Sequence, residues 1–237
     1  MEIILKSGDS LLVKVEPTTQ EPTTQNGDIL NYVFNGTVGQ PATNDFLEAY
    51  NTTYSDDLGE VWGKCIATQG SNSGFGGRFP ENFLKEGDTR IIEWDCFFPR
   101  DFDFTASGGA LKFMRQRVKS QPYSTDGGYV DIYINSATKG LRYHNELANT
   151  ATDTMNDSTL MLGQPNKIKL LVRFSSVNPL VQLWLNDSPV HEDKTTPTCT
   201  EQFKEVTDVL YFSYWNGNAP KNQASYIRNV TITNVRG

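Results

Sequence analysis

The chain has 237 residues, of which 37% are hydrophobic and 21% charged, and its formal net charge is −7. This size and composition fit one globular domain, and an all-β sandwich of this length is commonly a single domain. The acidic balance excludes a general nucleic-acid binder, which needs a basic face, and no stretch approaches the 18 apolar residues that suggest a membrane span.

The first 28 residues divide into two parts. Residues 1–16 alternate apolar and polar side chains around Lys-Ser-Gly-Asp-Ser, which predicts a β-hairpin arm. Residues 17–28 repeat Pro-Thr-Thr-Gln and lack large apolar side chains, which indicates a semi-extended linker. A hairpin alone is marginal in water. We therefore expect the arm to dock on its own body, on another copy or on a larger protein assembly.

The N-terminus has no basic start and no uninterrupted apolar run, so we expect no signal peptide. The corresponding expectation for localisation is a virion surface or, failing that, the cytoplasm. The three cysteines lack metal-ligand spacing, and we expect no metal at them.

Residues 29–237 are expected to form the folded domain. Only residues 44–54 and 142–150 could form a helical turn, and the remainder consists of β-branched and aromatic runs between turn residues. This pattern predicts an all-β, concanavalin A-like β-jelly-roll sandwich of two antiparallel sheets. The clearest runs are residues 29–38, 89–99, 127–135, 167–174, 180–187, 209–217 and 225–235.

Alternation within these runs predicts the core, because successive strand residues point to opposite faces. The expected core includes Trp94, Phe98, Leu170, Val172, Leu183 and Phe212. The opposite faces mix aromatic, charged and amide side chains, which suits a sugar with apolar C–H faces and a rim of hydroxyls. A face covered by loops is the simpler alternative. The predicted substrate contacts are Glu93, Asp95, Arg115, Tyr129, Asp131, Tyr133, Arg142, Lys169, Arg173, Gln182 and Trp184.

A local excess of base follows the pair Gly108-Gly109. Residues 109–119 contain four lysines and arginines and no acid, although the whole chain is acidic. Such a patch attracts a polyanion, most strongly at low salt. The predicted partner is therefore a polysaccharide, and acidic polysaccharides are among the candidates.

Residues 91–109, Ile-Ile-Glu-Trp-Asp-Cys-Phe-Phe-Pro-Arg-Asp-Phe-Asp-Phe-Thr-Ala-Ser-Gly-Gly, resemble the central strand and loop of the alginate and glucuronan lyases of polysaccharide lyase families 14 and 20. Later segments agree with these lyases in order, including Gly-Leu-Arg-Tyr-His-Asn-Glu-Leu at 140–147. The resemblance covers roughly residues 28–237. It implies a jelly roll whose concave sheet holds a polysaccharide.

The resemblance also implies β-elimination on a uronic acid. That reaction needs a group that neutralises the carboxylate, a base for the C5 proton and an acid for the leaving oxygen. The lysine of the family's Gly-Gly-Lys-Leu-Pro-Gly motif falls on Ala110, and Lys112 keeps the same strand parity. The family's catalytic tyrosine matches Tyr143, beside His144. If the chain is a lyase, the catalytic candidates are Tyr143, His144 and Lys112.

Three function classes remain: a carbohydrate-binding domain, an active lyase, and a structural decoration or fibre protein of a phage virion. A glycan-adhering domain displayed on a virion combines the first and third, and is the function we expect. A hydrolase is a weaker alternative. Glu93 and Asp95 would lie about 7 Å apart on one strand face, which suits paired carboxylates, but the further acidic and aromatic members of the concanavalin-like glucanase motif are missing. The acidic residues of 55–60 could hold a structural calcium; no other cofactor is expected.

Overall fold

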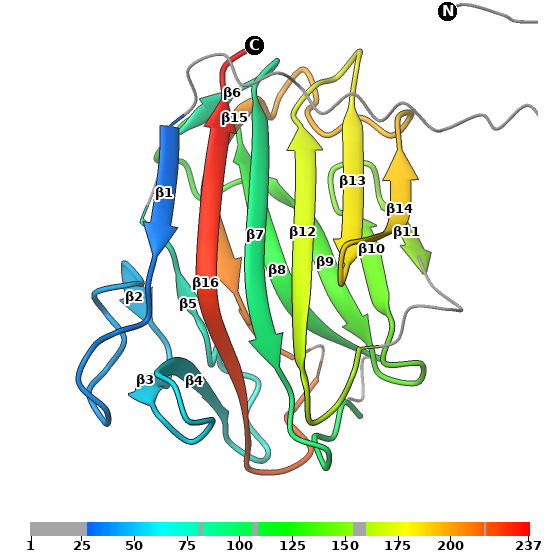
Figure 1. Cartoon of the computed structure of the whole chain (residues 1–237). Coiled ribbons are helices and arrows are strands. Elements are labelled where there is room, and N and C mark those ends of the chain that lie inside the picture. The colour runs from blue at the N-terminus through cyan, green and yellow to red at the C-terminus, as the bar shows by residue number, and fades with distance from the viewer. Residues whose placement is uncertain (1–27, 81–82, 106–108, 154–159, 216) are drawn as a thin grey trace, which may run out of the picture.

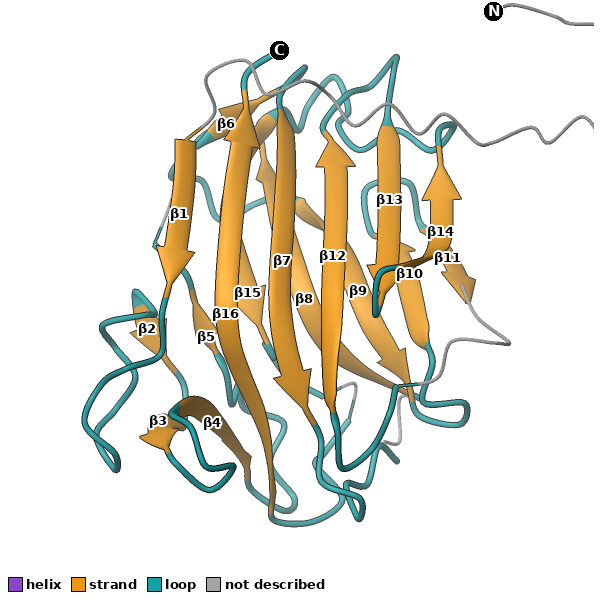
Figure 2. Ribbon diagram, in the orientation of Figure 1, coloured by secondary structure: helices purple, strands orange, loops and turns teal. Residues whose placement is uncertain are grey.

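The computed structural model describes residues 28–80, 83–105, 109–153, 160–215 and 217–237 (Figure 1). In this part of the chain, two antiparallel sheets of eight strands each lie face to face (Figure 2). The predicted all-β sandwich is confirmed. The described residues contain no helix that could cross a membrane. The predicted arm, residues 1–16, and the linker up to residue 27 lie outside the described residues.

One sheet, called the β7 sheet, has the order β14-β13-β12-β7-β16-β4-β3, with β1 beside β16. Its long strands form where Ile, Leu, Val and Trp alternate with polar residues. Register pairs Trp94 of β7 with Ile168 of β12, so that core rows run across neighbouring strands. Its strands are β1 (Asp28–Tyr32), β3 (Thr52–Ser55), β4 (Trp62–Ala67), β7 (Thr89–Phe97), β12 (Pro165–Arg173), β13 (Leu180–Leu185), β14 (Ser188–Asp193) and β16 (Gln223–Val235).

The other sheet, called the β8 sheet, has the order β11-β10-β9-β8-β15-β5-β2, with β6 beside β15. Its central pair, β8 and β9, joins the basic run to the alternating Tyr-Val-Asp-Ile-Tyr-Ile run. Its strands are β2 (Glu48–Ala49), β5 (Gly77–Arg78), β6 (Leu84–Lys85), β8 (Ala110–Lys119), β9 (Gly128–Asn135), β10 (Leu141–Asn145), β11 (Thr150–Asp153) and β15 (Glu205–Tyr211).

A β-bulge interrupts the register of β8 and β9 between Lys112 and Met114. Strict alternation would put Lys112 and Arg115 on opposite faces of the sheet, because their positions differ by an odd number. The extra residue in the bulge restores a common face: Lys112 lies opposite Tyr133, and Arg115 lies opposite Asp131. Two cations thereby point out of the sandwich on neighbouring rows.

The core fills the space between the two sheets. Each predicted core residue is buried, with at most 1% of its surface exposed: Trp94, Phe98, Leu170, Val172, Leu183 and Phe212. Trp94 of the β7 sheet meets Phe113 of the β8 sheet edge to face, with ring centroids 5.6 Å apart. Such aromatic contacts between the sheets set their separation and add to the area buried.

The loop after β7 closes one end of the sandwich. Phe102 and Phe104 turn inward and pack on Phe98, with ring centroids 5.0 and 5.1 Å from it. The intervening acid Asp101 points outward to Lys221, with Oδ2 2.9 Å from Nζ. In the Arg-Asp-Phe-Asp-Phe motif, the aromatic residues are therefore core and the first acid is surface.

Candidate glycan-binding face

The outer side of the β8 sheet, called here the β8 face, gathers most of the polar residues of β8, β9 and β10. Register places Lys112, Tyr133 and Arg142 in one row across the three strands. The next row contains Arg115, Asp131 and His144. The predicted contacts on this face are Arg115, Tyr129, Asp131, Tyr133 and Arg142, and they share it with the catalytic candidates Lys112 and His144.

Arg115 lies at the centre of the β8 face and is held by the side chains of Asp131, Glu146 and Tyr129. Its Nε donates to Asp131 Oδ2 at 3.0 Å, and its Nη2 donates to Glu146 Oε1 at 2.7 Å. Its guanidinium carbon is 3.5 Å from the centroid of the Tyr129 ring. Burial alone would lower the pKa of Arg115, but the carboxylates of Asp131 and Glu146 raise it above its ordinary value.

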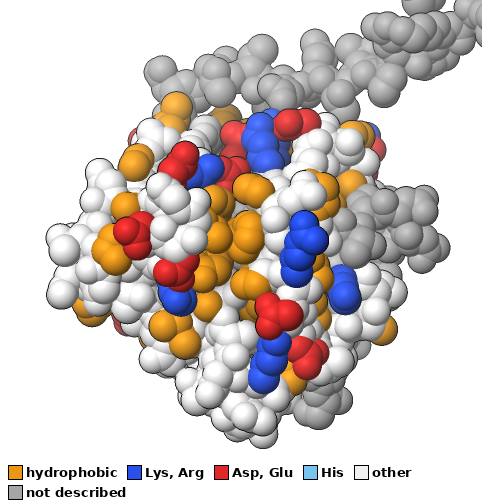
Figure 3. Space-filling view, turned by 60° about the horizontal axis from the view of Figure 1, so that its bottom comes forward, with side chains coloured by type: hydrophobic (Ala, Val, Ile, Leu, Met, Phe, Trp, Pro, Cys, Tyr) orange, Lys and Arg blue, Asp and Glu red, His pale blue; other side chains and the backbone are white. Residues whose placement is uncertain are grey.

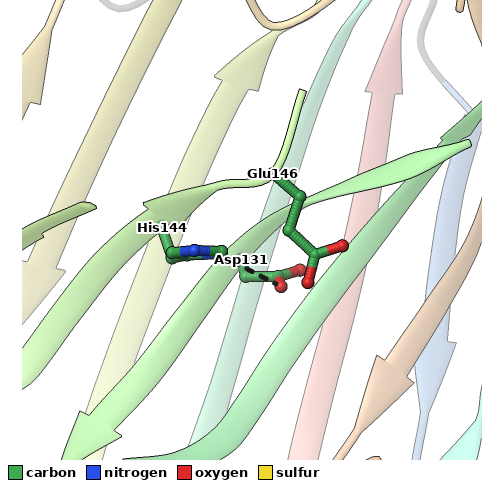
Figure 4. Close-up of side chains that lie close together, drawn as sticks. All are labelled: Asp131, His144 and Glu146. Carbon is green, nitrogen blue, oxygen red and sulfur yellow. Dashed lines mark ion pairs between the residues drawn. The ribbon is translucent and has the colours of Figure 1, made fainter. Parts of the chain in front are cut away.

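Asp131, His144 and Glu146 form a small cluster beside Arg115 (Figure 4). One oxygen or nitrogen from each lies within 4.8 Å of the others, which is a spacing that could hold a metal ion. His144 Nδ1 is 3.9 Å from Asp131 Oδ2, and its ring stacks on Tyr133 with centroids 4.8 Å apart. The Arg115 guanidinium already pairs with both carboxylates of the cluster. The cluster is therefore better suited to holding Arg115 than to binding a metal ion.

Lys112 has a different environment from Arg115. Its side chain is buried, with 6% of the residue exposed, and its Nζ donates a short hydrogen bond to the hydroxyl of Tyr214. The same Nζ lies 3.8 Å from the centroid of the Tyr214 ring and 5.7 Å from that of Tyr133. Within the described part of the chain, no carboxylate forms an ion pair with Lys112.

An open pocket of about 190 Å³ adjoins this lysine. Tyr214 connects the two, because its backbone carbonyl accepts from the amide of Lys112 at 3.3 Å while its side chain lines the pocket. Sequence reasoning missed Tyr214, although it belongs to the aromatic run 209–217, and it also missed Glu146. The pocket is lined by Tyr50, Gly74, Arg115, Tyr129, Leu210, Ser213 and Tyr214.

Beyond the pocket, the β8 face carries a row of paired charges. Arg78 Nη2 lies 2.6 Å from Glu48 Oε1, and Arg78 Nη1 lies 3.7 Å from Asp208 Oδ2. Arg117 approaches the same Asp208 oxygen at 3.8 Å and donates to the carbonyl oxygen of Thr125 at 2.7 Å. The arginines of this end are thus balanced by carboxylates of the same face.

The expectation that all the predicted contacts share one face is wrong. Six of them lie on the outer side of the β7 sheet, because β7, β12 and β13 pair with each other and not with β8 or β9. The sequence pattern separates the two faces of each strand, but it does not say which sheet a strand joins. These six residues are Glu93, Asp95, Lys169, Arg173, Gln182 and Trp184.

On the β7 sheet these residues contact one another and their neighbours. Lys169 Nζ lies 5.2 Å from the centroid of the Trp184 ring. The Glu93–Asp95 pair considered for hydrolysis lies on this sheet, away from the pocket. One of its carboxylates is already hydrogen-bonded, because Asp95 Oδ2 accepts from Asn229 Nδ2 at 2.6 Å. In the view of Figure 3, acidic and basic side chains are interspersed with hydrophobic ones and do not gather by sign.

Tyr143, the tyrosine that the resemblance implies for catalysis, is buried in the core and does not reach the β8 face. It lies opposite Ile132 in the core row of β9 and is 1% exposed. Its hydroxyl accepts from Asn145 Nδ2 at 3.2 Å, and its ring packs on His191 with centroids 4.9 Å apart. The neighbouring His144, of opposite parity, points to the β8 face.

The acidic segment 55–60, considered as a calcium site, forms ion pairs within the protein. Asp57 Oδ2 accepts from Lys64 Nζ at 2.6 Å and from the Tyr226 hydroxyl at 2.9 Å. Glu60 pairs with Arg228. The hydrogen bonds from Lys64, first, and from Tyr226 lower the pKa of Asp57. They also leave fewer oxygens for a metal.

The two antiparallel sheets define a concanavalin-like jelly roll, and the resemblance to alginate and glucuronan lyases is confirmed in the fold. No family model matches the chain, and no curated protein matches it in sequence. The solved structures below are 12–15% identical to it, which shows a common fold.

Alginate lyase vAL-1 from a Chlorella virus superimposes with a TM-score of 0.58 and 15% identity, covering 78% of this chain and 89% of that chain. A variant of alginate lyase Aly36B in complex with an alginate trisaccharide superimposes with a TM-score of 0.64 and 15% identity, covering 88% of this chain and 98% of that chain. The endo-β-1,4-glucuronan lyase from the fungus Trichoderma reesei superimposes with a TM-score of 0.56 and 12% identity, covering 91% of this chain and 96% of that chain.

Proposed function

We propose that this protein binds a polysaccharide across its β8 face and that Lys112 receives a carboxylate of the sugar chain. The observation that carries the proposal is the environment of Lys112: a buried ammonium between two tyrosines, with no carboxylate of the described residues paired to it. Burial of a charge without a counter-charge is costly. A uronate would supply that counter-charge on binding.

The aromatic residues of the open pocket support the same function. Tyr129 and Tyr214 line the open pocket, and Tyr214 is 37% exposed. Tyrosine combines an apolar ring for the C–H face of a sugar with a hydroxyl for its rim. The structural neighbours are consistent with this use of the fold, because one of them was solved with an alginate trisaccharide bound.

A second candidate is β-elimination on a uronic-acid polymer. It is favoured by the direct contact of Lys112 Nζ with the hydroxyl of Tyr214, because a phenol and an amine side by side provide both a proton donor and a proton acceptor. His144 lies on the same face and could take part. In this scheme Tyr214 takes the role that sequence resemblance implied for Tyr143.

Display on a larger assembly, such as a phage virion, is a separate proposal. Its support is the alternating pattern of residues 1–16 and the linker that follows. The arm would attach the domain and the β8 face would bind glycan.

The binding proposal is tested by retention on immobilised alginate, glucuronan, pectate and neutral glucans. Lys112→Ala should lose retention on the uronates, and a matched control, Lys169→Ala, should not, because Lys169 lies over Trp184 on the opposite sheet. Equal retention of Lys112→Ala and the unmodified protein would overturn the role of Lys112. Ultraviolet absorbance of an unsaturated product, present with the unmodified protein and lost in Tyr214→Phe, would establish the lyase.

A further inference from the structure

The positive charges of the β8 face differ in how far the protein neutralises them. Arg115 is shared between Asp131 and Glu146, at 3.0 and 2.7 Å. Both Arg115 and Asp131 are at most 2% exposed, so this pair is part of the fold and not a free cation. A sugar carboxylate arriving here would meet two protein carboxylates that already hold the guanidinium.

The other end of the face is balanced in the same way. Arg78 pairs with Glu48 at 2.6 Å, and Arg78 and Arg117 both approach Asp208, at 3.7 and 3.8 Å. Asp208 is 2% exposed and is therefore fixed in place. A run of sugar carboxylates along this end would meet arginines that are already paired with Glu48 and Asp208.

Lys112 is the exception in the middle of the face. Its ammonium contacts the Tyr214 hydroxyl and two tyrosine rings, and no described carboxylate pairs with it. Lys119, at the far end of β8, donates to the carbonyl oxygen of Pro122 at 3.4 Å and lies opposite Glu205 in the register. Lys112 is therefore a buried cation near the centre of the face to which no described carboxylate is paired.

The space next to Lys112 is suited to an uncharged sugar. Three tyrosines and Ser213 line the pocket, and the one cation among its described lining residues is Arg115, which pairs with Asp131 and Glu146. A pyranose could stack on these rings and hydrogen-bond to the hydroxyls. The residues concerned are Tyr50, Tyr129, Tyr214 and Ser213.

We infer that the β8 face prefers polysaccharides in which isolated uronates alternate with neutral sugars, and that it binds homopolymers of uronate more weakly. The inference rests on the proposed glycan binding and adds its substrate class. Specificity of this kind uses repulsion of the wrong ligand as well as attraction of the right one. Here Asp131 and Glu146, two carboxylates that share the single Arg115, provide the repulsion, and Lys112 provides the attraction.

The test compares the affinity of the full chain for three soluble probes of equal length. The probes are deacylated gellan fragments, which have one glucuronate per repeat among neutral sugars, the same fragments after carboxyl reduction, and glucuronan fragments. Gellan fragments should bind at least about tenfold more tightly than either of the others, because like charges brought together weaken binding strongly. Lys112→Met should bind native and reduced gellan equally, whereas Lys169→Met should keep the difference.

The possible results separate the inference from the proposed function. Glucuronan binding as tight as gellan or tighter, with Lys112 still required, would overturn the inference and leave glycan binding in place. No binding to any of these probes or to the immobilised polymers would overturn both. Glu146→Gln removes one fixed charge, on a side chain that is 29% exposed. It should reduce the preference for gellan over glucuronan by improving glucuronan binding. An unchanged preference would contradict the repulsion argument.

Discussion

The side chains of Arg115 and Asp131 form a 3.0 Å ion pair in which 2% of the arginine and none of the aspartate is exposed. The pair connects β8 to β9 on the outer side of the sheet, where Arg115 and Asp131 are direct register partners. Arg115 is therefore held in place by the protein. In the proposed function, Lys112 is therefore the cation that would pair with an acidic sugar on the β8 face.

Replacing Arg115 tests how much its buried ion pair with Asp131 contributes to the free energy of unfolding. Arg115→Met leaves Asp131 buried without its partner, and breaking such a pair costs on the order of 3–5 kcal/mol. Urea unfolding measures this loss. Arg117→Met is the matched control, because Arg117 is 23% exposed and its ion pair is 3.8 Å long, so its loss should be below about 1 kcal/mol. Equal stability of the two variants would show that the buried pair contributes little.

Trp94 and Trp184 lie on opposite faces of the β7 sheet and should respond differently to truncation. Trp94 is 1% exposed and packs on Phe113, so Trp94→Ala should cost about 3–5 kcal/mol. Trp184→Ala removes a partly exposed ring beside Lys169 and should cost clearly less. Thermal unfolding compares them. Retention on glycans should survive Trp184→Ala, and its loss would place binding on the β7 sheet.

Tyr143 and Tyr214, the two tyrosines considered as catalytic groups of a lyase, should respond differently to loss of the hydroxyl. Tyr143→Phe removes a hydroxyl that accepts from Asn145 within the core, so glycan retention should be unchanged. Tyr214→Phe removes the hydroxyl that contacts Lys112 and should weaken retention on uronates or abolish product formation. Affinity electrophoresis and product absorbance measure the two effects. The reverse order of effects would contradict the assignment of the β8 face.

Glu86 should contribute to acid sensitivity. Hydrogen bonds from the hydroxyl and amide of Ser176 lower its pKa below the ordinary value of 4.5. A lowered folded-state pKa stabilises the fold above pH 4.5, and this contribution disappears as the pH falls through the folded-state value. Glu86→Gln should therefore be less stable near neutral pH, by less than about 1 kcal/mol, and should match the unmodified protein in strong acid. Parallel stability–pH curves would exclude this role.

Removal of residues 1–25 should leave the sandwich folded. The described strands begin at Asp28, and β1 pairs with β16 through five register pairs from Asp28 to Tyr32. Circular dichroism and melting should be close to those of the full chain, while oligomerisation or attachment through the arm should be lost. An unfolded or insoluble truncated chain would show that the arm is part of the sandwich.

The all-β class and the inward side of the long strands follow from the amino-acid sequence alone. These are local properties: β-branched and aromatic runs favour extended backbone, and alternation with period two marks one face as apolar. The alternation is therefore sufficient to assign Trp94, Leu170 and Leu183 to the core. The basic run that includes Lys112 is also visible in the sequence, because charge composition does not depend on the fold.

Which polar faces belong together depends on the tertiary fold. Lys169 and Lys112 are equivalent in strand pattern, yet hydrogen bonds between distant segments place one on the β7 sheet and the other on the β8 sheet. The bulge after Lys112, which brings Arg115 to the same face, is likewise set by pairing with β9. Alternation specifies the two sides of a strand, whereas a strand's neighbours depend on non-local pairing, and so the site could be completed only from the fold.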